Sequence, residues 1–174
     1  MPAPNTDERQ RVRDYIVSQA AKLSIPELVA KVRADTAILR ETAAAVPAGR
    51  WRERPSEGDW SAAEVCAHIL EMNERSGSAI EAILDGNEPP GGVADVMRKD
   101  TGDAPGDAAT FWDTFIARRE RLYERVSRAN GDENLGVHLT HEWFGALTWR
   151  EWFLFMRVHD LDHMRQLKAL VPES

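Results

Sequence analysis

The stretch WREWFLFMRVHDLDHMRQ, from Trp149 to Gln166, decides the fold of this chain. Its apolar side chains recur every three or four residues, which predicts an amphipathic helix with one buried face. His159 and His163 are four residues apart, so both lie on this face with their Cβ atoms roughly 5–6 Å apart. Two imidazoles so placed can bind one metal ion, as the paired histidines of helical zinc sites do. The stretch therefore predicts a buried helix that carries a metal site.

Three further long helical patterns precede this one. We expect long helices over residues 24–46, 61–84, 108–129 and 148–170, and a short N-terminal helix over residues 7–23. The first, second and fourth long helices begin with a capping box, in which a serine or threonine is followed three residues later by glutamate. Gly86 and Gly131 stand just past two helices, as C-terminal glycines do. The strand signal is nearly absent, and residues 131–147 are predicted to be a loop.

The lengths of these segments predict an all-α fold. Helices of about 20 residues are about 30 Å long, which suits a four-helix bundle. The loop over residues 86–107 is too long for a simple connector, so it is either a crossover or a lid, and it favours a crossover topology. We expect residues 1–24 to form an N-terminal extension with the short helix, and residues 25–171 to form the bundle domain.

Composition limits the classes of function. A net charge of −7, with arginines scattered among acids, argues against a nucleic-acid surface. The N-terminus is polar and lacks the apolar core of a signal peptide, and no apolar run approaches the roughly 20 residues of a membrane span. Cys66 is the single cysteine, which excludes an internal disulfide and a thiolate cluster. We therefore expect a cytoplasmic protein without a membrane or nucleic-acid partner.

A third histidine, His68, is in phase with the apolar residues of the second long helix and faces inward. Each inward histidine could instead be a core residue with its own buried hydrogen-bond partner. Two on one face favour a metal, because one cation satisfies both rings. If His68 meets His159 and His163, the three form a site suited to zinc, nickel or ferrous iron, with coordination positions left to water. Cys66 lies about 160° from His68 around the helix and is excluded as a ligand.

Metal-bound histidines usually donate their second ring nitrogen to a carboxylate or a carbonyl. The acidic residues near the right helix faces are Glu64, Glu71, Asp160 and Asp162. Asp160 is the more typical of a flanking surface residue. Gln166 lies one turn beyond His163 on the same face, where we expect it to line the pocket.

The loop residues have simpler interpretations. His138 is expected to be solvated, and His141 either lines the cavity or, as we favour, makes a plain turn contact. Trp60 precedes the cap of the second long helix, as a hydrophobic staple residue does. Trp51 and Trp143 lie in loops, where they could wall a small-molecule pocket or simply pack.

Two segments resemble the DinB-like superfamily. Residues 59–69, DWSAAEVCAHI, resemble the W-S-x-x-E-v-x-x-H-i/l opening of that family's second helix. Residues 141–152, HEWFGALTWREW, followed by HDLDHMRQL over residues 159–167, are similar to its closing H-P-x-F-G-x-L-T-x-x-E-W and H-D-x-x-H-x-r-Q segments. The similarity spans most of residues 26–170. Glu142 departs from the pattern, because the family usually has proline there.

The resemblance implies a four-helix bundle of up-down-down-up type, commonly a homodimer. It also implies a divalent metal held by three histidines, which map onto His68, His159 and His163. Similar proteins include transferases and isomerases that depend on mycothiol, bacillithiol or glutathione, the mycothiol-dependent maleylpyruvate isomerases among them.

The leading hypothesis is a metal-dependent enzyme that acts on a small molecule. The ion would lower the pKa of a bound water or a cofactor thiol, and no protein side chain would be the nucleophile. Thiol transfer is preferred over hydrolysis because of the family resemblance. The alternatives are a non-catalytic metal- or ligand-binding bundle related to stress, and a structural helical dimer without metal.

Overall fold

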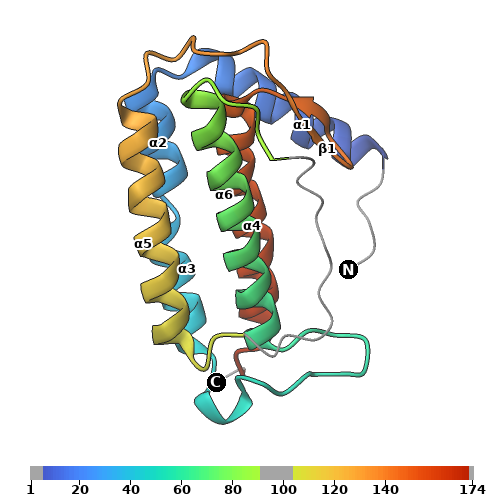
Figure 1. Cartoon of the computed structure of the whole chain (residues 1–174). Helices are drawn as coiled ribbons and strands as arrows, with labels where there is room; N and C mark the ends of the chain where they lie inside the picture. The colour runs from blue at the N-terminus through green and yellow to red at the C-terminus, as the bar shows by residue number, and fades with distance from the viewer. Residues whose placement is uncertain (1–5, 91–103, 173–174) are drawn as a thin grey trace.

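The computed structural model describes residues 6–90 and 104–172, which form a four-helix bundle with an additional N-terminal helix (Figure 1). The elements in chain order are α1 (Thr6–Lys22), α2 (Ile25–Arg33), α3 (Thr36–Ala45), the short 3-10 helix η1 (Ala48–Arg50), α4 (Ala62–Leu84), α5 (Ala108–Ser127), β1 (Leu139–His141), β2 (Gly145–Leu147) and α6 (Trp149–Ala169). The all-α bundle predicted from the sequence is confirmed.

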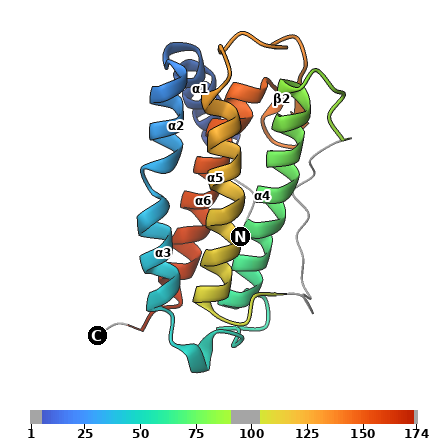
Figure 2. The ribbon, with the colours of Figure 1, turned by 60° about the vertical axis from the view of Figure 1, so that its left-hand side comes forward.

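The directions of the helices follow the up-down-down-up pattern. In Figures 1 and 2 the colours show α2 and α3 running one way, α4 and α5 both running the other way, and α6 returning. α4 packs against both α5 and α6, and α2 and α3 pack against the same two helices from the other side. Because α4 and α5 are consecutive and parallel, the end of α4 and the start of α5 lie at opposite ends of the bundle. The expected crossover is thus confirmed, while residues 91–103 of its loop, the suggested lid, lie outside the described residues.

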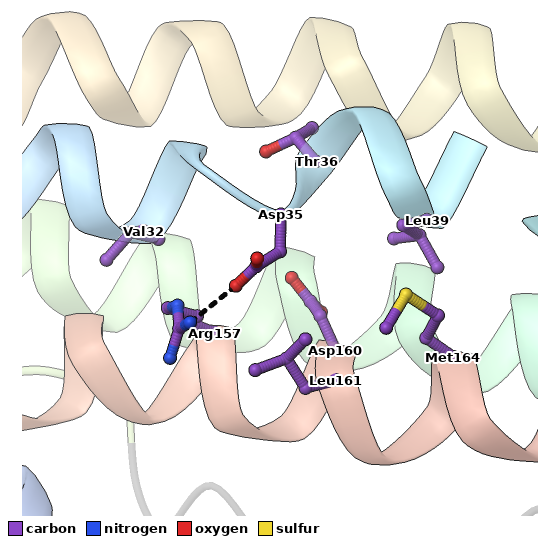
Figure 3. Close-up of a pocket in the computed structure, with 8 residues that line it drawn as sticks. All are labelled: Val32, Asp35, Thr36, Leu39, Arg157, Asp160, Leu161 and Met164. Carbon is purple, nitrogen blue, oxygen red and sulfur yellow. Dashed lines mark ion pairs between the residues drawn. The ribbon is translucent and has the colours of Figure 1, made fainter. Parts of the chain in front are cut away.

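The helix expected over residues 24–46 is interrupted at Ala34 and Asp35, so one prediction was wrong at this point. The interruption turns the Asp35 carboxylate toward α6, where it pairs with Arg157 at 2.6 Å (Figure 3). The hydroxyl of Thr36, the next residue, lies 3.5 Å from the hydroxyl of Tyr123 on α5. Contacts with other helices therefore divide a segment that by its local pattern alone is continuous.

The predicted helix starts follow from their capping boxes. The Ser61 hydroxyl accepts a hydrogen bond from the Glu64 amide, and the Ser61 amide donates to the Glu64 carboxylate at 2.9 Å. Thr148 and Glu151 make the same reciprocal pair at the start of α6. These two caps fix the residues at which α4 and α6 begin.

The loop expected over residues 131–147 contains a small hairpin, which corrects that expectation. β1 pairs antiparallel with β2, with Leu139 opposite Leu147 and His141 opposite Gly145. Three residues in each strand are too few to produce a detectable alternation of apolar and polar residues. Gly145 has φ of +70°, a conformation that glycine adopts without strain.

Two clusters of buried apolar side chains fill the bundle. One contains Trp149, Trp152 and Met156 near the start of α6, together with Met72 of α4. The other contains Leu167 near the end of α6, and the residues Val65, Ile69, Phe111 and Phe115. The segment of α6 between Met156 and Leu167 carries His159 and His163, so the polar site lies where the two clusters meet. Within the described residues no helix is both long enough and apolar enough to cross a membrane.

Candidate metal centre

The structure brings together the three histidines that the sequence selected. Nε2 of His159 lies 3.0 Å from Nε2 of His68 and 3.1 Å from Nε2 of His163. One ring nitrogen from each of the three lies within 4.8 Å of the others. His68 belongs to the second turn of α4, and the other two belong to α6, so two antiparallel helices build the group.

The group is buried and has an aromatic neighbour. His68 is 1% exposed, and His159 and His163 are each 8% exposed. The Trp60 ring lies parallel to that of His163, with centroids 6.4 Å apart, and edge-on to that of His68 at 5.3 Å. Trp60 therefore flanks the site, a position that the hydrophobic staple interpretation did not include. The sequence signal for this position was that Trp60 immediately precedes the cap of α4, the helix that carries His68.

His163 is held in its neutral form. Burial lowers its pKa to about 3, and the neighbouring His159 and His68 lower it in the same direction. Its Nδ1 lies 3.0 Å from the side-chain oxygen of Gln166. Since an amide oxygen only accepts, Nδ1 carries the proton and the lone pair of Nε2 faces the other two rings. Gln166, which we expected to line the pocket, contacts His163 and orients its ring.

The donor set fits a divalent transition metal. Neutral imidazoles suit zinc, nickel and iron, and zinc–nitrogen bonds of about 2.0–2.1 Å in tetrahedral geometry separate two ligand nitrogens by about 3.3 Å. The two observed separations, 3.0 and 3.1 Å, are close to that value. One cation would accept the lone pairs of three rings that otherwise face one another. Three protein ligands would also leave coordination positions open, as reactive sites do and closed structural sites do not.

We expect the metal-free protein to lose stability as the pH falls below about 6.5. His163 takes up its proton in the unfolded chain near its ordinary pKa of 6.5, and in the folded protein only near 3. The unfolded state therefore binds more protons across this window, and this group alone lowers the free energy of unfolding by up to about 1.4 kcal/mol per pH unit. Above pH 6.5 its contribution is constant.

Urea denaturation in the presence of a chelator, from about pH 7 to about pH 5, measures this dependence. His163→Gln is the comparison, because glutamine keeps a polar side chain that does not titrate. The lower limit stays above the ordinary pKa values of aspartate and glutamate. Equal slopes for wild type and variant would contradict the prediction.

Asp160 is not the flanking surface residue that we expected. Its side chain is 18% exposed and pairs at 2.5 Å with Arg119 of α5, whose side chain is 1% exposed. The other carboxylate oxygen lies 3.8 Å from Nδ1 of His159. Burial raises the pKa of Asp160, while Arg119 opposes that change. Sequence reasoning missed this pair because Arg119 reaches Asp160 from a different helix.

The other acidic candidates interact away from the rings. Glu64 caps α4 and pairs with Arg54, and these hydrogen bonds outweigh burial, so its pKa is lowered. Glu71 pairs with Arg75 one turn later at 2.8 Å. Asp162 lies 3.9 Å from Arg165 on the exposed side of α6.

His141 lies outside the three-histidine group. Its Nδ1 accepts a hydrogen bond from the Trp143 amide at 3.0 Å, which is the turn contact that we favoured, and its ring packs 4.5 Å from that of Phe155. His138 is exposed. Burial raises the pKa of the Cys66 thiol, and Cys66 is not part of the group.

The loop tryptophans pack against the protein. Trp51 is 3% exposed and donates a hydrogen bond to the Pro105 carbonyl at 2.8 Å. Trp143 is half-buried beneath the Arg9 guanidinium, 5.4 Å from its ring centroid. Of the two interpretations of these rings, packing therefore describes their observed contacts.

Fold and site together define a class of protein: helical bundles with a buried three-histidine group that can hold a metal ion. The profile of the DinB superfamily matches residues 31–167, and the chain belongs to this superfamily. The match runs from α2 to the end of α6 and includes all three histidines. No curated protein matches the chain.

Proposed function

We propose that the protein is a metal-dependent enzyme acting on a small molecule, with His68, His159 and His163 as the metal ligands. The observation that carries the proposal is the convergence of three ring nitrogens from two helices within 4.8 Å, in a buried place. The nature of the donors supports zinc, nickel or iron as the metal.

A divalent cation bound there would act as a Lewis acid. The residues of the chain would do the rest. The three histidines would hold the ion, Gln166 would keep His163 in the ligating tautomer, and the apolar clusters on either side would exclude water. The Cys66 thiol does not suit the role of nucleophile, because burial raises its pKa. A nucleophile from outside the protein is therefore part of the proposal.

A low-molecular-weight thiol is the nucleophile that we propose, which makes the reaction a thiol transfer. Its support is the resemblance to thiol-dependent members of the superfamily, and mycothiol, bacillithiol and glutathione are the compounds to test. We further propose that the protein works as a cytoplasmic homodimer. The net charge of −7 supports a small-molecule substrate over a nucleic acid.

A second candidate is a non-catalytic metal-binding bundle. The observation that favours it is the burial of the histidines, which are 1–8% exposed and lie beside Trp60. A tightly enclosed metal would stabilise the bundle rather than meet a substrate.

Two measurements test the proposal in sequence. Elemental analysis of protein purified without a histidine tag is expected to find close to one transition metal per chain. The metal-loaded protein is then assayed with each thiol against a panel of electrophiles, beside the chelated protein and His68→Ala. Thiol consumption that requires both the metal and His68 is expected. Metal at full stoichiometry without turnover above the variant's background would favour the second candidate, and absence of metal would refute both.

A further inference from the structure

The ion pair between Arg119 of α5 and Asp160 of α6 lies beside His159. Oδ2 of Asp160 faces the guanidinium at 2.5 Å, and Oδ1 faces Nδ1 of His159 at 3.8 Å. One oxygen of the Asp160 carboxylate therefore contacts Arg119 of another helix, and the other oxygen lies near the ring of His159.

The atoms of His159 show why that position matters. Its Nε2 is the atom that approaches both other histidines, so Nε2 is the nitrogen that would meet a metal. Nδ1 must then carry the proton, and a negative charge beside it favours that tautomer and the corresponding ring orientation. The side-chain oxygen of Gln166 favours the same tautomer of His163.

Stability is a poor explanation for the pair. Arg119 is almost completely buried, and its Nε and Nη1 have no hydrogen-bond partner among the described residues. A guanidinium left partly unsatisfied in a core costs folding free energy, and buried ion pairs can often be replaced by apolar residues without loss. What the arrangement does supply is a carboxylate that is held in one place beside Nδ1 of His159.

We propose that Arg119 and Asp160 form a positioning pair that holds His159 in the orientation and tautomer required for metal binding. The inference rests on the proposed metal site and assigns it a supporting residue on a helix, α5, that contributes no ligand. Figure 3 shows Asp160 on α6, one turn beyond Arg157. Arg157 forms a comparable ion pair with Asp35 that is 2.6 Å long and also joins α6 to another helix.

That second pair provides a matched control. Asp35→Asn removes the carboxylate that pairs with Arg157 of α6 and leaves the histidines unchanged. Asp160→Asn removes the carboxylate that lies beside His159. Both full-length variants are titrated with Co²⁺, and the dissociation constant and visible absorption spectrum are recorded. Asp160→Asn is expected to weaken binding by about 10–100-fold and to change the spectrum, as loss of a supporting residue does. Asp35→Asn should remain within about twofold of wild type.

A double variant, Arg119→Met with Asp160→Leu, covers the case in which Asp160→Asn fails to fold. It removes both charges, so no buried charge is left without its partner, and the variant is expected to fold. Its affinity for Co²⁺ is nevertheless expected to be at least tenfold lower than that of the wild-type protein. Co²⁺ affinity of these variants equal to wild type, or an equal loss in Asp35→Asn, would overturn the positioning role alone. Failure of the wild-type protein to bind Co²⁺ would overturn the proposed function and this inference with it.

Discussion

His159→Ala is expected to lower the affinity of the protein for Zn²⁺ by roughly a thousandfold. Apparent binding free energies of about 10–16 kcal/mol for zinc sites with four ligands correspond to about 2.5–4 kcal/mol per ligand, and the upper end of this range is about a thousandfold in Kd. Among the three proposed ligands, His159 is the one whose loss should matter most, because its Nε2 makes both of the close approaches in the group. Isothermal titration with a competing chelator measures the change.

The same substitution should also remove the stabilisation that metal confers. At a free metal concentration of 100 Kd, binding adds about 2.7 kcal/mol, which raises Tm by about 5–10 °C in a chain of this length. His138→Ala is the control, because His138 is an exposed histidine outside the group. It should retain wild-type affinity and the full Tm shift. A His159→Ala protein that still binds Zn²⁺ like the control would exclude His159 as a ligand.

Trp149→Ala is expected to destabilise the fold by about 3–5 kcal/mol, as truncation of a large core side chain does. Trp149 is fully buried at the first position of α6, and its indole nitrogen donates a hydrogen bond to the Glu133 carbonyl at 2.7 Å. The substitution would leave a cavity in the cluster near the start of α6 and deprive that carbonyl of its donor. Urea denaturation of the metal-free protein measures the loss.

Two further variants separate the causes. Trp149→Phe keeps most of the ring volume and removes the hydrogen bond, so about 1–2 kcal/mol of the loss should remain. Ile38→Ala truncates an apolar side chain that is 47% exposed, and it should change stability by no more than about 0.5 kcal/mol. A loss below about 2 kcal/mol for Trp149→Ala would show that the surrounding core closes around the cavity.

Helix boundaries were the part of the fold most readable from the sequence. Ser61 with Glu64 and Thr148 with Glu151 cap α4 and α6 where the capping boxes predicted. Such caps act within one turn, so the neighbouring residues contain all the necessary information. The interruption at Asp35 escaped prediction because its partner, Arg157, is far away in the sequence.

The candidate site likewise combines features that the local sequence predicts with features that depend on contacts between helices. Selecting His68, His159 and His163 required only helical periodicity and the family motifs, since each property belongs to a single helix. The role of Asp160, beside His159 on α6, was predicted incorrectly. Asp160 follows His159 in the chain and was taken for a surface residue, although Arg119 of α5 draws it into the bundle.

The amino-acid sequence by itself determined which segments are helical, which faces of them are buried, and that two histidines share one face of α6. These properties depend on interactions over three or four residues. Only the tertiary structure decided that His68 of α4 reaches the other two, that Trp60 flanks them, and that an ion pair from α5 lies beside His159. Those contacts depend on the axial register and rotation of packed helices, which the whole core sets by fitting its side chains together.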